Sequence, residues 1–545
     1  MNNLIKHYSE TDRKLIFEIE ELYKTRNYDH ALKKITDRLE SLKVCKFKEE
    51  YYLKIELAGY LIDIADAGKI KEAAYKGLEI IENEKNNIKN IIVGSSTEYN
   101  LGNAKSAIFK IQREESDFKY TPNNILYLIE SKNHYWRAFK NEIDEKNQFN
   151  PQLVVNLANA LSSCGRVVES LQYYDLVLER FPDHPQANAS RAKELIWLKD
   201  LSGGFTQNLI YQAKSGYENA SQSKDVPEWL TSYWKRQSMQ LDKFLKELKF
   251  DESEIHKEKS ETLSEYLSLS KYRRFCIDSH LTLSEHSLYC NCIGSRRDDL
   301  LICTPFEFFD AGFIPVMEKI LNRLKSEYAF TRLLYYYSTE EVDNELNLFD
   351  SEVMFTELHD SESINAKSEM LRTSFRLNFG ILDKIASAIC LLYDLADKKE
   401  SIYFESFWNP RNRNGSIKQK SRWEKINSIN NISLIALYTQ ATDLNSKNGE
   451  WSIFKSWRNA LEHNQLSLLC DKELGNNIFK IYELNPSLLR VDKKYFQNKT
   501  LHLLQFTRSA IFNFIFLVRN EGRKTPPKKG IDITHTFKFK NDNEN

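Results

Sequence analysis

The chain has 545 residues, and its 77 lysines and arginines are balanced by 77 aspartates and glutamates. This length exceeds what one hydrophobic core usually holds, so two or three domains are expected, and the zero net charge excludes a general attraction to nucleic acids or anionic membranes. Glycine and proline are scarce, at 17 and 11 residues, and apolar residues recur at spacings of three and four. This pattern predicts an almost entirely helical protein.

Neither the cysteines nor the apolar runs indicate secretion or membrane insertion. The eight cysteines are scattered, and the close pair Cys290 and Cys292 lacks a second pair to complete a zinc site. The N-terminus has no apolar leader segment, and the run AIFNFIFLV near the C-terminus is about half of the roughly 20 residues that a membrane span needs. We therefore expect a cytoplasmic protein that does not enter a membrane.

The first part of the chain, residues 1–250, is predicted to form a helical solenoid. Residues 150–185, NPQLVVNLANALSSCGRVVESLQYYDLVLERFPDHP, indicate two helices joined by a turn at Cys164 and Gly165, with small or apolar residues where the two helices pack. This segment resembles a tetratricopeptide repeat (TPR) of about 34 residues. One helix pair cannot bury its apolar face alone, so weaker versions of the pattern are expected to stack on it, at 26–35, 56–81 and 99–107.

A charged stretch, FDESEIHKEKSETLSEY at residues 250–266, ends this region because few of its side chains suit a buried position. Residues 251–356 are interpreted as a linker and a mixed intermediate region of helix and irregular chain. From about residue 357 the helical periodicity returns, and four apolar segments with short connections predict an up-and-down bundle over 357–525. The segments are 366–397, 433–445, 450–469 and 501–524, and a polar tail is expected at 526–545.

The third of these segments contains WRNALEH, which places Arg458, Asn459 and His463 in one predicted helix. On a helical wheel Asn459 and His463 share one flank of the apolar stripe, and Arg458 and Glu462 lie on the opposite flank. A solvated helix face would show the same pattern, and a looser arginine and histidine pair occurs at 274 and 280. The buried stripe of this helix is predicted to consist of Ile453, Trp457, Ala460, Leu461 and Leu468.

The bundle around this motif resembles the HEPN superfamily. The segments FRLNFGILDKIASAI, IYFESFW, LIALYTQATDL and WRNALEHNQLSL are similar, in this order, to the helices of bacterial HEPN proteins that carry tetratricopeptide repeats before the nuclease-like domain. The resemblance implies an all-α protein in which a TPR-like helical solenoid precedes an HEPN-like four-helix bundle. It also implies that Arg458 and His463 form a metal-independent ribonuclease site and that two bundles meet about a two-fold axis in a homodimer.

The residue types suit this chemistry. RNA supplies its own 2′-hydroxyl as the nucleophile, so the site needs a group that moves protons near neutral pH and a cation that holds the phosphate as negative charge grows. Histidine, with an ordinary pKa of about 6.5, meets the first need at His463. Arginine, always charged and fork-shaped, meets the second at Arg458, and Asn459 would orient the imidazole or the phosphate. No cofactor and no metal ion is expected.

Other polar residues of the bundle have two interpretations each. Asp383 and Asp443 either face the site and tune the catalytic histidine, or are surface acids and helix-end partners. His502, at the start of the last predicted helix, is either a second acid or base or a solvated residue. The basic residues after the first bundle helix either grip an RNA backbone or belong to exposed loops. These basic residues are Arg411, Arg413, Lys418, Lys420 and Arg422.

The sequence therefore predicts a metal-independent endoribonuclease of HEPN type, regulated by a TPR sensor region that receives a protein or nucleic-acid trigger. The resemblance further implies a role in stress response or antiviral defence. The alternative is a non-catalytic scaffold for protein interaction or RNA binding, because solenoids bind partners and HEPN-like bundles can lack cleavage activity. The sequence contains no P-loop, HExxH motif or nucleophile elbow that would indicate another chemistry.

Overall fold

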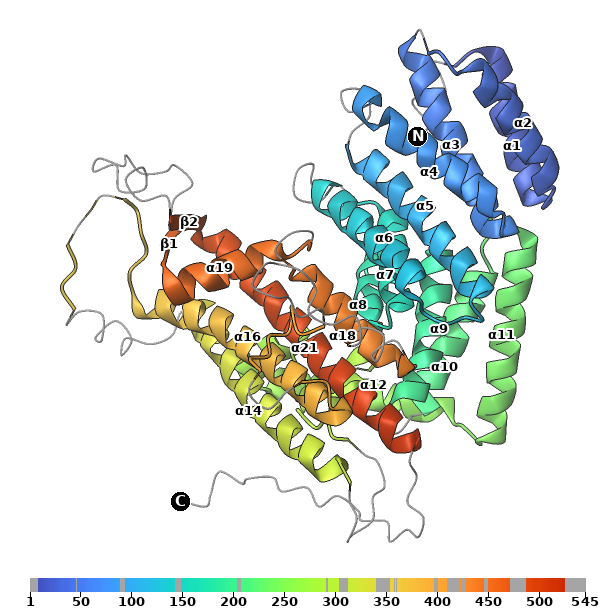
Figure 1. Cartoon of the computed structure of the whole chain (residues 1–545). Helices are drawn as coiled ribbons and strands as arrows, with labels where there is room; N and C mark the ends of the chain where they lie inside the picture. Colours follow the sequence, from blue (N-terminus) through green and yellow to red (C-terminus); the bar gives the residue numbers. More distant parts are fainter. Residues whose placement is uncertain are drawn as a thin grey trace. The chain divides into compact units, whose positions relative to one another are not determined.

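The computed structural model confirms an all-α fold for the part of the chain that it describes (Figure 1). Helices make up its regular structure apart from two strands of five residues each. The described residues are 8–45, 47–88, 94–142, 149–202, 207–290, 293–302, 312–339, 353–356, 358, 360–396, 400–408, 422, 428–445, 449–470 and 487–524.

The chain divides into two compact units, each of which has its own internal contacts. The first unit consists of Met1–Glu194, Ala213–Asp242 and Lys425–Asn430. The second consists of Leu195–Gln212, Lys243–Glu424 and Asn431–Asn545.

The first unit begins with helices that follow one another as hairpins (Figure 1). Each helix from α1 to α7 contacts the next helix along the chain, and α5 also contacts both α3 and α7. This is the arrangement of stacked helix pairs, as predicted for a solenoid. The helices are α1 (Glu10–Lys24), α2 (Tyr28–Ser41), α3 (Lys48–Gly68), α4 (Lys71–Ile88), α5 (Gly94–Glu115), α6 (Pro122–Lys140), α7 (Pro151–Ser163) and α8 (Val167–Leu178). The next three helices, α9 (Pro185–Leu201), α10 (Gln207–Ser221) and α11 (Glu228–Glu247), each have residues in both units.

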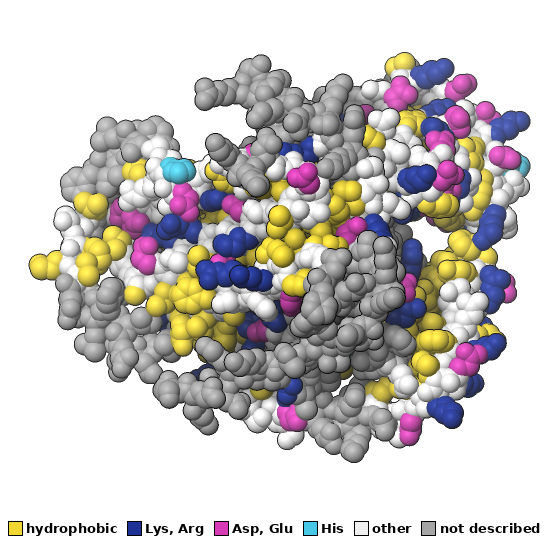
Figure 2. All heavy atoms as spheres, turned by 60° about the horizontal axis from the view of Figure 1, so that its bottom comes forward, with side chains coloured by type: hydrophobic (Ala, Val, Ile, Leu, Met, Phe, Trp, Pro, Cys, Tyr) yellow, Lys and Arg dark blue, Asp and Glu magenta, His cyan; other side chains and the backbone are white. Residues whose placement is uncertain are grey.

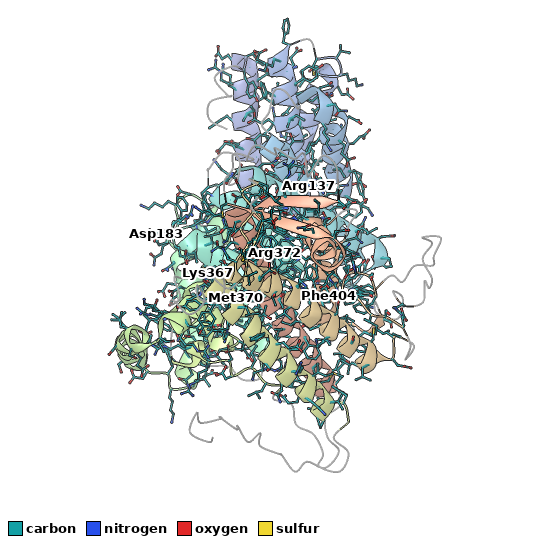
Figure 3. The ribbon with its side chains drawn as sticks, turned by 90° about the vertical axis from the view of Figure 1, so that its left-hand side faces the viewer. Arg137, Asp183, Lys367, Met370, Arg372 and Phe404 are labelled. Carbon is teal, nitrogen blue, oxygen red and sulfur yellow. The ribbon has the colours of Figure 1, made fainter. Side chains whose placement is uncertain are left out.

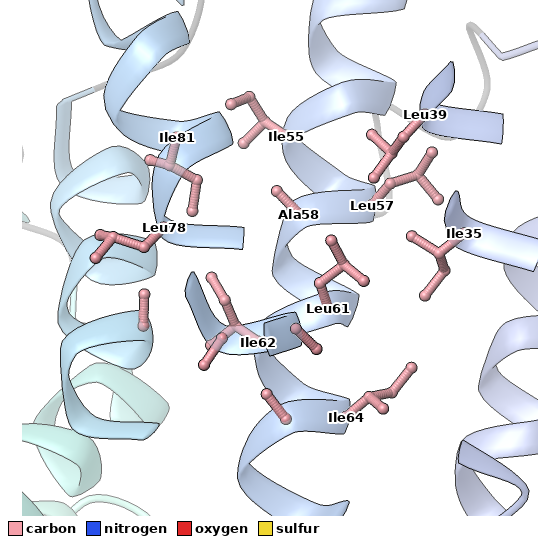
Figure 4. Packing of buried hydrophobic residues seen from close by; sticks show 14 of the residues in the cluster. Ile35, Leu39, Ile55, Leu57, Ala58, Leu61, Ile62, Ile64, Leu78 and Ile81 are labelled. Atoms are coloured by element: carbon pink, nitrogen blue, oxygen red, sulfur yellow. The ribbon is translucent and has the colours of Figure 1, made fainter. Parts of the chain in front are cut away.

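Helix α3 shows why consecutive pairs must stack, because it is apolar on two sides (Figure 4). Leu57 and Leu61 lie toward α2, whereas Ala58 and Ile62 lie toward α4. All four side chains are buried in one hydrophobic cluster that extends from α1 to α5. A helix with two apolar faces needs a neighbour on each, so the hairpins continue into a stack rather than closing as one pair.

The best predicted repeat, at residues 150–185, forms the expected helix pair α7 and α8. The turn between them passes through Gly165, whose φ of +79° lies in the left-handed region that glycine adopts without strain. Ala158 and Tyr174 are buried in one cluster across the pair, and the Tyr174 hydroxyl donates to Asn159 Oδ1 at 2.7 Å. The helix pair is therefore confirmed, and its assignment to the tetratricopeptide class stays a prediction.

The second unit is organised around α21 (Lys493–Lys524), a helix of 32 residues. It contacts α14, α16, α18 and both strands, and α19 packs against α16. The elements of this unit in chain order are α12 (Glu252–Ser268), α13 (Lys271–Asp278), the short 3₁₀ helices η3 (Glu285–Leu288) and η4 (Ile293–Arg296), α14 (Ile314–Thr339), α16 (Ala366–Tyr393), α18 (Ile432–Asp443), α19 (Ser452–His463), β1 (Gln465–Leu469), β2 (Leu488–Asp492) and α21.

By length and composition alone, α21 is the one helix in the described ranges that could cross a membrane. Its most apolar window of 18 residues is 83% buried inside the structure. Core helices of globular domains have the same composition, so the packing of the neighbouring helices against α21 accounts for its apolar sequence. The helix begins at Lys493, eight residues before the predicted start at 501.

Helix α14 lies in the segment predicted to be a linker and mixed region, and it packs against α16 and α21 of the bundle. The buried Arg332 of α14 donates to Leu281 O at 2.9 Å and forms an ion pair with Asp298. Burial alone would raise the pKa of Asp298, but the hydrogen bonds and charge of Arg332 outweigh it and lower that pKa to about 2. The bundle therefore includes a helix that precedes residue 357, and the chain before that helix is anchored to it.

The predicted helix at 450–469 is too long, because α19 ends at His463 and residues 465–469 form strand β1. Asn464 adopts an extended conformation with φ of −135°, and β1 then pairs in parallel with β2. Leu466 and Leu468 are buried in the sheet rather than on the helix stripe to which Leu468 was assigned. Short apolar segments fit helix and strand periodicity equally well, and here a partner strand distant in sequence decides between them.

A buried carboxylate makes the first unit sensitive to pH. Glu194 is 1% exposed and accepts hydrogen bonds from the hydroxyls of Ser162 and Ser170, both at 2.6 Å. Burial raises the pKa of Glu194 to about 7, although the two serine hydroxyls act in the opposite direction. Because the folded state binds the proton more tightly than the unfolded chain, the free energy of unfolding should decrease as pH rises from about 4.5 to about 7.

We expect Glu194→Gln to remove this dependence, because glutamine keeps the shape of the side chain and carries no charge. Above pH 7 the variant should be more stable than the unsubstituted protein by up to about 3 kcal/mol, and the difference should shrink toward pH 4.5. Urea unfolding at pH 5 and pH 8 measures this difference, with Glu79→Gln at an exposed position of α4 as the control. An equal response of both variants to pH would contradict the assignment.

Candidate functional site

Helix α19 is fixed to the bundle by an aromatic contact with α16 and α21. Phe454 and Trp457 of α19 are buried, and their rings lie 5.9 Å and 5.8 Å from the ring of Phe375 in α16. Phe496 of α21 completes the cluster, 5.0 Å from both Phe375 and Trp457. The predicted stripe is confirmed at Trp457 and Ala460, whereas Ile453 is exposed and Phe454 takes its place.

Arg458 lies on the side of α19 that faces α16. Its Nη2 donates to Oδ2 of Asp383 at 3.1 Å, and its guanidinium carbon lies 5.0 Å from the ring centre of Phe379 and 5.8 Å from that of Tyr403. The other N–H groups of Arg458 make no hydrogen bond within the described ranges, and the side chain is 21% exposed. The arginine is therefore held in one orientation while most of its donors stay available to an anion.

Asp383 positions Arg458 and does not contact His463. Its second oxygen, Oδ1, accepts the backbone N–H of Phe404 at 2.9 Å, so the carboxylate joins α16, α19 and the aromatic segment at 400–408. Burial raises the pKa of Asp383, although the Phe404 N–H and the charge of Arg458 both lower it. Because its two carboxylate oxygens accept hydrogen bonds from Arg458 and from the Phe404 N–H, Asp383 is a positioning residue for the arginine and not a partner of the histidine.

A second ion pair joins α16 and α19 one turn further along. Arg376 Nε lies 3.1 Å from Glu462 Oε1, and Arg376 Nη2 lies 3.4 Å from Glu462 Oε2. These two residues are 45% and 37% exposed, so this pair is more open to solvent than the pair of Arg458 and Asp383. No role is predicted for Arg376 from the sequence. Arg376 precedes Asp383 by seven residues, a spacing that places both residues on the same side of a helix, and this was the signal that could have identified it.

Asn459 and His463 share the solvent-facing flank of α19, as the helical wheel predicts, and both are exposed. His463 is the last residue of the helix and makes no side-chain hydrogen bond within the described part of the chain. Residues five apart on a helix point about 140° away from each other. Arg458 and His463 of one chain therefore do not face a common point.

Neither Asp443 nor His502 lies at a site shared with His463. Asp443 is fully buried at the end of α18, where its carbonyl accepts the N–H of Trp451 at 2.8 Å. His502 is inside α21 rather than at its start, and its ring lies 4.0 Å from the ring of Trp451. Both residues therefore support the packing at the start of α19: Asp443 is a buried helix-end residue rather than a surface acid, and His502 is neither at a helix start nor a solvated residue.

The basic residues predicted to contact RNA divide into two groups. Arg422 is 5% exposed, and it donates to both carboxylate oxygens of Glu400 at 3.1 Å and 2.8 Å and to Phe407 O at 2.7 Å. An arginine buried in this way stabilises the fold, so the prediction that Arg422 contacts RNA is wrong. The remaining four residues predicted to contact RNA lie outside the described part of the chain. They are Arg411, Arg413, Lys418 and Lys420.

On the face that Figure 2 shows, the lysine and arginine side chains of the described residues lie among aspartates and glutamates and form no large patch of a single charge. On the first turns of α16, Figure 3 labels Lys367, Met370 and Arg372, all three of which are half-buried. Arg372 forms ion pairs with Glu362 and Glu369. Among the described residues, no group of three or more histidines, cysteines, aspartates or glutamates could hold a metal ion.

The different exposure of the two ion pairs predicts different energetic contributions. Asp383→Ala leaves Arg458 and the Phe404 N–H without their partner in a partly buried position, so we expect a loss of about 1–3 kcal/mol in the free energy of unfolding. Glu462→Ala, in the exposed pair of the same two helices, should cost less than about 1 kcal/mol. Urea unfolding followed by circular dichroism compares them, and equal losses would show that the Asp383 contacts do not stabilise the fold.

Comparison with known proteins identifies the second part of the chain. Residues 310–521 match the family model of the LA2681-like HEPN domain. No curated protein and no solved structure matches the chain. The match begins near α14, in agreement with the packing of that helix in the bundle, and it confirms the HEPN part of the predicted resemblance. The described part of the chain is thus all-α, and its C-terminal residues 310–521 are similar to the LA2681-like HEPN domain.

Proposed function

We propose that the HEPN domain is a metal-independent endoribonuclease and that the N-terminal helices regulate it. The observation that carries this proposal is the state of Arg458 and His463. Asp383 orients Arg458 through one N–H group and leaves the other N–H groups of this arginine available. His463 is exposed at the end of α19 and has no hydrogen-bond partner in the described ranges. Polar atoms of buried side chains are bonded within the fold, whereas the guanidinium of Arg458 and the imidazole of His463 have polar atoms available to a ligand, and the cleavage test below separates a catalytic flank from a solvated one.

The two side chains suit cleavage by transesterification. The 2′-hydroxyl of the RNA attacks the adjacent phosphorus atom and the 5′-oxygen leaves, so one proton is removed and another is delivered. An imidazole can perform both transfers near neutral pH, and the Arg458 guanidinium can stabilise the charge on the phosphate oxygens. Asn459, exposed between them, is proposed to orient the phosphate. The products are a 2′,3′-cyclic phosphate, or the 3′-phosphate formed by its hydrolysis, and a 5′-hydroxyl.

The stacked helices of the first unit are proposed as a sensor for a protein or nucleic-acid trigger. Their architecture supports this role, because stacked helix pairs offer an extended surface on which partners bind. The proposed setting is stress response or antiviral defence in the cytoplasm. The alternative function is a non-catalytic scaffold in which the HEPN domain mediates interaction or binds RNA, and the cleavage test below separates the two.

We expect the purified protein, with its trigger where one is needed, to cut single-stranded RNA in the presence of EDTA. His463→Ala should reduce the rate at least about 100-fold, within the range that general acid and base groups contribute. Arg458→Lys should also reduce it strongly, because lysine keeps the charge and loses the fork geometry. Mapping of fragment ends measures both the rate and the chemistry.

The control for this experiment is His30→Ala, at an exposed histidine of α2 in the first unit, which should cut as the unsubstituted protein does. Cleavage that requires a divalent metal ion, or equal fragment patterns from the unsubstituted protein and His463→Ala, would overturn the proposed mechanism. RNA binding without cleavage under all conditions would favour the scaffold.

A homodimer is proposed because one chain does not direct Arg458 and His463 to a common point. An isologous contact between two bundles would bring the arginine of one chain toward the histidine of the other. The exposed flank that carries Asn459 and His463 is available for such a contact within the described structure.

We expect activity to belong to the pair of chains. After equal mixing and exchange with an inactive Arg458→Ala, His463→Ala double variant, about one quarter of dimers retain two intact chains, so activity near one quarter supports a shared site. Mixing the two single variants should restore activity, because one heterodimer site then contains an intact arginine and an intact histidine. Activity near one half in the first mixture and none in the second would show that each chain has a complete site.

A further inference from the structure

Besides Arg458, a second arginine forms an ion pair between α16 and α19, namely Arg376 of α16. Arg376 pairs with Glu462, the residue that directly precedes His463 in α19. Arg458 precedes His463 by more than a helical turn and lies on the opposite flank, against Asp383. Glu462 lies on the flank of α19 that also carries Arg458, so the guanidinium groups of Arg376 and Arg458 both approach this flank from α16 and α19.

Among the described residues of α16 and α19, the arginines Arg372, Arg376 and Arg458 differ in their exposure and in the number of groups that they contact. Arg372 is 11% exposed and pairs with two carboxylates, and Arg458 lies near two aromatic rings. Arg376 is 45% exposed and pairs with Glu462 alone, at 3.1 Å and 3.4 Å. Exposed pairs with distances in this range contribute little to stability, so the partner of Arg376 is readily exchanged.

We propose that Arg376 is a second phosphate-binding residue of this site and that Glu462 occupies it until an RNA phosphate takes its place. The inference rests on the proposed function only for the identity of the anion, a phosphodiester of single-stranded RNA. A guanidinium offers the same two parallel N–H groups to a phosphate as to a carboxylate, so the exchange conserves the geometry of the pair. Glu462 is then an internal competitor, and its negative charge also repels the incoming phosphate.

This arrangement predicts opposite effects for the two partners of one ion pair. Arg376→Ala should weaken RNA binding, whereas Glu462→Gln should strengthen it, because glutamine neither competes for Arg376 nor repels the phosphate. A pair with a purely structural role would give weaker or unchanged binding for both variants. Arg376→Lys should retain part of the affinity, since charge is kept and bidentate geometry is lost.

The test uses the full-length protein and a fluorescent single-stranded RNA with 2′-O-methyl groups, which cannot be cleaved because the nucleophile is blocked. Fluorescence anisotropy at several salt concentrations gives Kd and its salt dependence. We expect about a 5-fold to 20-fold higher Kd for Arg376→Ala, and a slope of log Kd against log salt that is lower by about 0.7, the value for one phosphate contact with a single strand. Glu462→Gln should lower Kd at least about 3-fold, and the double variant should bind more weakly than Glu462→Gln and no more weakly than Arg376→Ala, because the charge repulsion is removed but the phosphate contact is lost.

Two control variants change the same charges elsewhere. Arg323→Ala removes an exposed arginine from an ion pair on α14 of the same bundle, and Glu18→Gln removes an exposed carboxylate paired with Lys34 in the first unit. Neither should change the salt slope. A Kd for Glu462→Gln equal to or above that of the unsubstituted protein would overturn the proposal, as would failure of the unsubstituted protein to bind this RNA.

The result is distinguishable from failure of the proposed nuclease activity. Tighter binding by Glu462→Gln together with an absence of cleavage in unmodified RNA would support the phosphate site and reject the enzyme. Metal-independent cleavage together with unchanged binding by both variants would support the enzyme and reject the role of Arg376.

Discussion

The burial of α21 is the constraint on which the rest of the HEPN domain depends. This helix is apolar around most of its circumference, so other elements must cover it, and α14, α16, α18 and the two strands do so. Its buried polar residues then select which segments pack where, because each needs a partner away from water. Arg508 donates to Thr282 O, Arg519 forms an ion pair with Glu285, and Asn513 donates to Gln440 of α18. Apolar burial drives the packing, and these bonds fix its geometry.

Helix α16 links the packing around α21 to the candidate site, because one side of it carries aromatic residues and another carries charged residues. Phe375 joins the aromatic cluster with α19 and α21, and Phe379 lies beside the Arg458 guanidinium. Arg376 and Asp383 stand two turns apart and carry opposite charges that match Glu462 and Arg458 of α19. Arg376 pairs with Glu462, and Asp383 pairs with Arg458, so both ion pairs form in one antiparallel alignment of α16 and α19. The position of the motif is thus set by packing and refined by charge.

Local features of the sequence were sufficient to predict the helices and the flanks of the motif. Asn365 caps α16 by accepting the Ser368 N–H, and the helical repeat alone separates Arg458 from His463. Partners that are distant in sequence were not predictable in the same way. Asp383 was recognised as a candidate, yet its contact with Arg458 depends on how two helices align. The burial of Arg422 depends on Glu400, and strand β1 depends on β2; neither pairing leaves a periodic signal.

Charge compensation in the second unit has a consequence for the proposed action of this protein on RNA, because the chain has no net charge. Arg372, Arg376 and Arg458 are each paired with a carboxylate, so this described part of the surface attracts polyanions weakly in the resting state. RNA binding then requires a phosphate to replace a carboxylate at an arginine. This replacement costs little free energy where the ion pair is exposed to solvent. Arg458 is oriented by a partly buried carboxylate, whereas Arg376 has an exposed one. An enzyme built in this way would bind RNA through the geometry of a few guanidinium groups, and selectivity would depend on whether a phosphate reaches two of them at once.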